Sequence, residues 1–150
     1  MPAFESRFDE PTEVLTHVAI APVTAKAIVQ CAVEWYERLA GRGYHALWDL
    51  RGQPVRIEIE EVTFGLRDHL AWVNEHRKGH RHAYLVTSRV AMYLARALKA
   101  RVKLDWDVFD DEQLARDWLR TGDARYRRPA DPLAPVDANR TLNVSRGFDG

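Results

Sequence analysis

The chain has 150 residues, of which 46% are hydrophobic and 29% charged, the composition of an ordinary single globular domain. Its 22 basic residues equal its 22 acidic residues, so no overall field favours nucleic acid or an anionic membrane. The one cysteine, Cys31, cannot form an internal disulfide, and no apolar stretch approaches the ~20 residues that span a bilayer. We therefore expect a cytoplasmic protein without a signal peptide, an integral membrane segment or a nucleic-acid partner.

The chain opens with the pattern of a β-hairpin. Residues 3–9 alternate apolar and polar side chains, residues 10–12 read as a turn, and the β-rich run 14–20 ends before Pro22. Thr24 can then cap a helix whose apolar residues recur at helical spacing until two glycines, Gly41 and Gly43, stop it.

Residues 44–52 are predicted to form the central strand. Their middle is apolar and interrupted only by Asp49, as in a strand buried on both faces of a mostly parallel sheet. Asp49 and Arg51 are expected at the rim where open α/β sheets place functional groups. For Asp49, capping of backbone amides is favoured over a catalytic dyad with His17 or His45.

Residues 56–75 carry apolar side chains at helical spacing and are predicted to form the second helix. Phe64 and Trp72 lie on a different face of it, where packing on the edge of the core is favoured over a contact face for a partner. The histidine-rich and basic run 76–82 is interpreted as a solvated loop, ahead of an anion contact. A metal site comes last, because Gly79 breaks the spacing and no carboxylate or cysteine completes a ligand set.

A short buried strand is predicted at 83–86, and Thr87, Ser88 and Arg89 follow it. Either hydroxyl can cap the next helix, and a helix N-terminus also presents free N–H groups to an anion. Capping is favoured over ligand binding, since no glycine-rich phosphate loop accompanies these residues.

Residues 102–109 alternate in polarity and are predicted to form a strand near an edge of the sheet, with one solvated face. The last helix is predicted to begin at a capping box of Asp110 and Gln113 and to run to Leu119. Residues 123–150 contain three prolines and few apolar residues. They are predicted to be an extended tail, disordered in isolation or laid as a strap, beyond a domain that spans 1–122.

Three segments in this order resemble the SpoIIAA-like group of the STAS superfamily, which includes anti-sigma factor antagonists and the tails of sulfate transporters. Residues 47–52 (Leu-Trp-Asp-Leu-Arg-Gly) resemble that group's Leu-x-Asp-Leu-x-Gly strand end. Residues 83–88 (Ala-Tyr-Leu-Val-Thr-Ser) form the second segment. Residues 108–119 resemble the closing segment of the group, in which a Phe is followed by acidic residues and then by Trp-Leu. The resemblance covers residues 14–119.

The resemblance implies an α/β fold, with a mixed sheet of four to five strands that starts with a β-hairpin, four helices on one side, and partner recognition around the second helix. Anti-sigma factor antagonists carry a phosphorylatable serine at the start of that helix. The matching residues here, 53–60, contain neither serine nor threonine, and Thr63 is the next hydroxyl along the chain. We therefore expect no phosphorylation switch.

Two functions remain open from the sequence. The favoured one is a non-catalytic interaction or regulatory module that binds a protein partner or a second copy of itself. The alternative is a carrier or sensor of an anionic or lipid-like small molecule at the sheet rim, and a deep apolar pocket would favour it. The residues expected to bind a ligand or partner are Asp49, Arg51, Thr87, Ser88, Arg89, Phe64 and Trp72. No nucleophile with its base, carboxylate pair or metal set can be assembled, so neither an enzyme nor a cofactor is expected.

Overall fold

The computed structural model describes residues 2–58, 60–65, 67–99, 105–123 and 125, and the side chains of Thr63, Phe64 and Leu94 lie outside this description. Predictions for the side chain of Phe64 and for most of the tail, residues 126–150, therefore fall outside the described part of the chain. Within that part, no helix combines the length and the apolar character needed to cross a bilayer.

The centre of the fold is a five-stranded sheet in which the strands lie in chain order. The strands are β1 (Phe4–Asp9), β2 (Val14–Ala19), β3 (His45–Asp49), β4 (Arg81–Leu85) and β5 (Asp105–Phe109). The first two form the predicted antiparallel hairpin, and every later neighbour is parallel. β3 therefore occupies the middle of the sheet, as its apolar sequence predicts.

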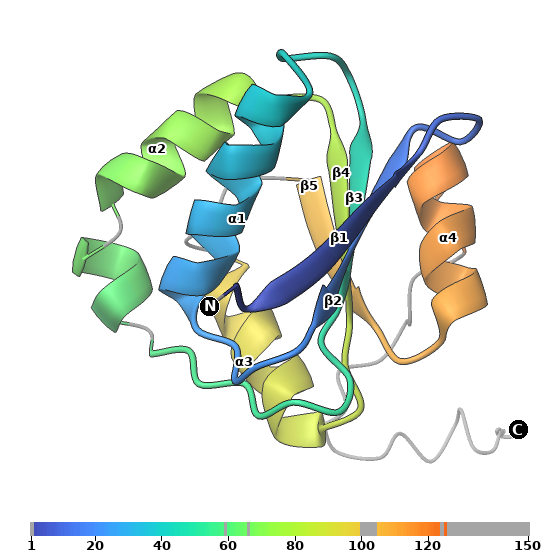
Figure 1. Cartoon of the computed structure of the whole chain (residues 1–150). Helices are drawn as coiled ribbons and strands as arrows, with labels where there is room; N and C mark the ends of the chain where they lie inside the picture. Colours follow the sequence, from blue (N-terminus) through green and yellow to red (C-terminus); the bar gives the residue numbers. More distant parts are fainter. Residues whose placement is uncertain (1, 59, 66, 100–104, 124, 126–150) are drawn as a thin grey trace, which may run out of the picture.

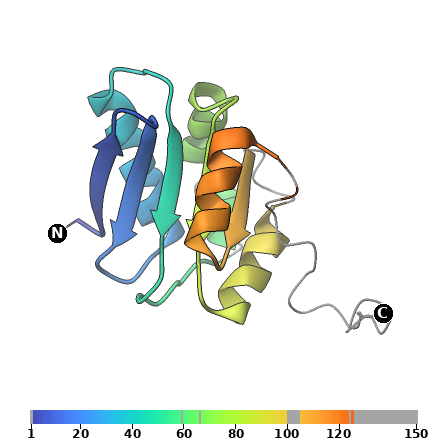
Figure 2. The ribbon, with the colours of Figure 1, turned by 90° about the vertical axis from the view of Figure 1, so that its right-hand side faces the viewer.

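Helices cover both faces of the sheet, three of them on one side and one on the other (Figure 1). The helices α1 (Ala25–Arg38), α2 (Arg67–His76) and α3 (Arg89–Leu98) connect successive parallel strands, and right-handed crossovers in one direction place all such helices on the same face. The last helix, α4 (Glu112–Thr121), follows the final strand and returns across the opposite face (Figure 2). The resemblance implies helices on only one side of the sheet, and this prediction is wrong for α4.

Alternation along β3 divides the core into two layers. Ala46 and Trp48 point toward α1, α2 and α3, while Leu47 belongs to the cluster under α4, and all three are about 1% exposed. The α4 layer is closed by Phe109, Trp118 and other side chains that are fully buried. A strand buried on both faces is thus confirmed.

The second predicted helix begins later than expected. Residues 52–58 are not helical, and Val55 forms an isolated parallel bridge with Val23, fixed by hydrogen bonds from Val23 to Pro54 and from Arg56 to Val23. A short π-helix, η1 (Glu61–Gly65), precedes α2. The polarity of residues 55–58 alternates with a period of two, which is the pattern of an extended segment rather than a helix.

Two further predictions need correction at the strands β4 and β5. The run 76–82 is a solvated loop only in part: Lys78 and Gly79 are exposed in a turn, but β4 begins at Arg81, and Arg77 and His82 are buried. β5 is an edge strand as predicted, but its second face is covered by α4 rather than by water, and Asp107 is buried there.

The N-cap of α4 is Asp111, one residue beyond the predicted Asp110. Its carboxylate accepts a hydrogen bond from the backbone N–H of Leu114 at 3.0 Å. The helix ends at Gly122, whose φ of 69° is left-handed and whose missing side chain leaves room for the Arg81 guanidinium, 2.9 Å from where a Cβ would lie.

Replacing Asp111 with alanine should lower the free energy of unfolding by about 1 kcal/mol, because one orphan N–H of α4 loses its acceptor. Asp111→Asn keeps a capping oxygen and should lose much less. Urea denaturation of the three proteins measures the difference, and equal losses in both variants would show that the cap is not what Asp111 contributes.

Candidate functional site

The rim predicted as a binding site is occupied by an ion-pair network. The Arg51 guanidinium donates to both carboxylate oxygens of Asp49 at 2.9 Å and to Glu112 of α4 at 3.0 Å. These hydrogen bonds from Arg51 hold the pKa of the Asp49 carboxyl below its usual value. Asp49 also accepts from the backbone N–H of Arg51, as the capping interpretation predicts. The charge of Arg51 is therefore compensated within the protein.

The residues after β4 serve the start of α3. Ser88 is the N-cap, and its hydroxyl oxygen accepts a hydrogen bond from the Ala91 N–H at 3.2 Å. Thr87 and Arg89 on either side are exposed. Capping thus accounts for Ser88, and this segment lies at the end of the strand next to β3, the placement predicted for it.

Trp72 lies away from the rim, between α1 and α2. Its ring stacks on His76 at 4.2 Å and meets the Tyr36 ring edge-on at 5.1 Å. It is partly buried against the core, so the prediction that it packs on the core edge is confirmed.

Buried polar residues replace the predicted basic loop at the opposite end of the sheet. Arg77 is 3% exposed, donates a hydrogen bond to the Tyr44 carbonyl at 2.6 Å and places its guanidinium 3.7 Å above the Tyr44 ring. His45 accepts a hydrogen bond from the Arg81 N–H through Nδ1. Among the described residues, no group of three or more His, Cys, Asp or Glu could hold a metal ion.

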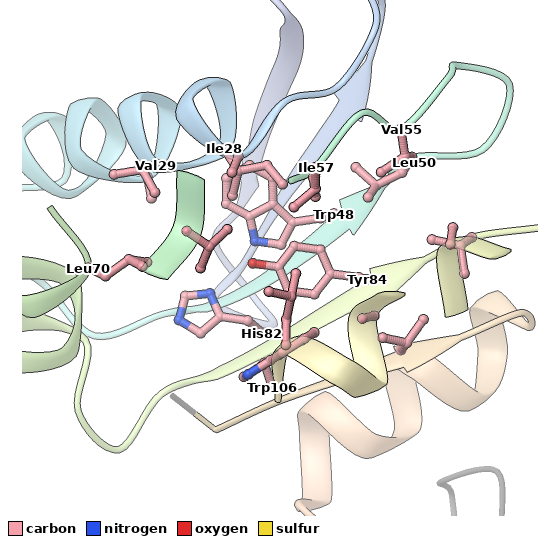
Figure 3. A pocket seen from close by; sticks show the side chains of 18 of the residues that line it. Ile28, Val29, Trp48, Leu50, Val55, Ile57, Leu70, His82, Tyr84 and Trp106 are labelled. Carbon is pink, nitrogen blue, oxygen red and sulfur yellow. The ribbon is translucent and has the colours of Figure 1, made fainter. Parts of the chain in front are cut away.

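The most distinctive feature of the structure is an apolar cavity between the sheet and the helices α1, α2 and α3 (Figure 3). Its volume is about 110 Å³. The floor comes from alternate residues of β3, β4 and β5, and the roof comes from small and branched residues of the helices. The described residues that line it include Trp48, His82, Tyr84, Trp106, Val29, Ala32, Leu70, Val73, Ala91 and Ala95.

The extended segment after β3 forms one wall of this cavity. Val55 and Ile57 line it, and both are only partly buried, as are Ile28 of α1 and Leu70 of α2. The cavity is therefore not fully closed off from solvent along its lining. The bridge between Val55 and Val23 holds this wall in place.

Polar groups border this otherwise apolar space. Among the described residues, the indole Nε1 of Trp48 and the Nε2 of His82 are buried and have no hydrogen-bond partner. The rings of Trp48 and Tyr84 are nearly parallel, with centroids 5.8 Å apart (Figure 3). Buried polar groups are normally paired, so unpaired ones in a cavity are typical of a binding site.

The cavity is electrically neutral. None of its described lining residues is Asp, Glu, Lys or Arg. Burial lowers the pKa of His82 well below its ordinary value and raises the pKa of the Tyr84 hydroxyl, so both side chains are uncharged at neutral pH. The site can therefore accept an apolar molecule without a formal charge.

Ser6, His17 and Cys31 meet beside the cavity, behind Trp48. The His17 Nδ1 lies 2.6 Å from the Ser6 hydroxyl and 3.4 Å from the Cys31 sulfur. Burial lowers the pKa of His17 to about 3 and raises the pKa of the Cys31 thiol to about 11. An activated nucleophile needs a base that can take its proton. The imidazole of His17 is too weak a base, and the thiol of Cys31 ionises too poorly, to meet this requirement. This cluster supports the Trp48 ring, which packs against His17 at a tilt of 30° with centroids 4.0 Å apart.

The cavity went unpredicted because its parts are far apart in the sequence. The signal that could have indicated it is the pairing of polar aromatic residues on one face of adjacent strands: Trp48 lies opposite Tyr84 in the register of β3 and β4. The facing helices carry the small residues Ala32, Ala91 and Ala95, which leave space between the helices and the sheet.

No protein-family model and no curated protein matches the chain. Among solved structures, the chain is similar to an uncharacterized protein of the DUF3478 family with a SpoIIAA-like fold, from Shewanella loihica PV-4. The two are 20% identical, the match covers 78% of this chain and 92% of that one, and the TM-score is 0.52. This similarity shows the fold alone: the chain has a SpoIIAA-like fold, as its sequence motifs predict.

The buried histidines should make the protein sensitive to acid. Burial lowers the pKa from 6.5 to about 3 for His17 and to about 4 for His45. The unfolded chain binds protons that the folded chain does not, so the free energy of unfolding should fall as the pH drops below 6.5, by up to ~1.4 kcal/mol per pH unit for each histidine.

Urea denaturation across this pH range measures the slope, and His17→Asn should reduce it by about one proton. Between about pH 7 and 8 these histidines are neutral in both states and should contribute no slope. A stability that stays constant from neutral pH down to about pH 4 would contradict the burial of neutral histidines.

Proposed function

We propose that this chain is a non-catalytic binding protein for a small apolar molecule, which it holds in the cavity between the sheet and the helices α1, α2 and α3. The observation that carries the proposal is the cavity itself, lined by apolar residues and containing the unpaired Nε1 of Trp48. The sequence left a lipid-like small molecule as an alternative to a protein partner, and the cavity favours that alternative. The proposed site is the cavity and not the sheet rim.

The apolar lining favours occupancy by an apolar molecule. A ligand in this space removes apolar surface from water and gains dispersion contacts with the lining residues.

The volume limits the size of the ligand. An engineered apolar cavity of ~150 Å³ in another protein binds benzene, so about 110 Å³ suits a compact ring or a short chain. A longer lipid-like molecule would have to extend beyond this volume. An anion at the rim has weaker support, because Arg51 is already paired with Asp49 and Glu112.

Filling the cavity should abolish binding without unfolding the protein. Ala95 on α3 lines the cavity, and Ala95→Leu should weaken benzene binding by at least about tenfold while leaving the thermal midpoint equal or higher. Ala97→Leu on the same helix adds the same bulk away from the lining and should bind benzene like the wild type.

Titration followed by methyl chemical shifts in NMR measures the affinity. The proposal predicts saturable shifts in the methyl groups of the lining residues Val29 and Leu50. Wild-type protein that shows no saturable shift, or an Ala95→Leu variant that binds as well as the wild type, would contradict it.

A protein-interaction role is the second candidate function, with a second copy of the chain as the partner. Val90 and Tyr93 lie one turn apart on α3 and are 66% and 47% exposed. A net charge of zero removes long-range repulsion between copies.

Sedimentation equilibrium should then give a dimer mass for the wild type and a monomer mass for Val90→Lys. A monomeric wild type at high concentration would exclude this role.

A further inference from the structure

We infer that the ligand is an uncharged, mainly hydrocarbon molecule with one hydrogen-bond acceptor, such as a ketone, ester or ether oxygen, which the Trp48 indole N–H binds. This inference rests on the proposed function and adds the chemistry by which the cavity selects its ligand.

The indole N–H defines what the ligand must offer. A tryptophan side chain can donate a hydrogen bond but cannot accept one. Trp48 is 1% exposed and its Nε1 has no partner among the described atoms. Leaving such a donor unpaired costs its full desolvation penalty, so a ligand with an acceptor at this point gains more than a pure hydrocarbon of the same shape.

The donor is held in a fixed direction. The Trp48 ring packs against His17 at a tilt of 30°, lies nearly parallel to Tyr84, and meets Phe4 edge-on with centroids 5.2 Å apart. A ring clamped in this way loses little entropy when it binds, because its orientation is already set. The clamp therefore provides a preorganised recognition point.

Two more polar groups border the same space. The His82 Nε2 is buried without a partner among the described atoms, and Tyr84, whose ring lies nearly parallel to that of Trp48, also lines the cavity. A neutral imidazole nitrogen and a hydroxyl can each donate or accept, so they can adapt to the same oxygen or to a second polar atom of the ligand. Trp48 is the group that requires an acceptor.

The absence of charge from the described lining excludes ionic ligands. A carboxylate or ammonium group in this cavity would be buried without a counter-ion, at a cost far above the gain of one hydrogen bond. The acceptor must therefore belong to a neutral group.

Cyclopentanone and methylenecyclopentane make a matched pair of probes, because they share one shape and differ in a carbonyl oxygen against a CH₂ group. The protein variant carries β-(3-benzothienyl)alanine at position 48 alone, which keeps the shape of the indole and replaces its N–H with sulfur. Affinities come from NMR titration of the full chain with each probe.

The inference predicts that the replacement at position 48 weakens cyclopentanone binding by about tenfold and leaves methylenecyclopentane binding unchanged. In wild-type protein, cyclopentanone should also move the Trp48 indole N–H resonance downfield, which methylenecyclopentane should not. The Trp48→Phe variant, which lacks this indole, identifies the Trp48 resonance for this second measurement.

A failure of this inference can be told apart from a failure of the proposed function. Suppose that both probes bind the wild type, that the replacement at position 48 weakens them equally, and that neither moves the indole resonance downfield. The inference is then overturned while the proposed function stands. If neither probe binds the wild type, both are overturned.

Discussion

The pairing of β3 with a parallel strand on each edge and a helical layer on each face is the constraint on which the rest of the structure depends. A strand held in this way cannot shift its register by one residue without exchanging its two faces. Trp48 is therefore fixed toward α1, α2 and α3, while its neighbour Asp49 is fixed toward α4 and pairs with Arg51. The apolar cavity and the ion-pair rim lie on opposite faces for this reason.

The two faces of the sheet are packed differently, and this difference assigns their roles. Under α4, Phe109 and Trp118 are 0% exposed and lie with ring centroids 5.5 Å apart. On the opposite face the helices carry Ala32, Ala91 and Ala95 above large aromatic residues of the sheet, and space remains between them. The proposed ligand would lie in this second space.

The succession of strands and helices along the chain and the caps at Thr24 and Ser88 could be predicted from the sequence because they depend on local patterns. The sequence places the cap of α4 one residue early. The burial of Arg77 could not, because a basic residue beside histidines indicates solvent unless the Tyr44 ring and carbonyl that receive it are known to be near. The cavity is a property of three layers together. Residues 47–52 and 83–88, which carry the family resemblance, do contain Trp48 and Tyr84, but the sequence indicates nothing about the empty volume above them.

A crystal structure of the protein purified from its own host tests the central claim most directly. The account predicts density for a small, non-aqueous molecule between the sheet and the helices α1, α2 and α3, with an oxygen or nitrogen atom about 3 Å from the Trp48 Nε1. A cavity closed by the surrounding side chains, or an ordered water as the sole partner of that N–H, would contradict it.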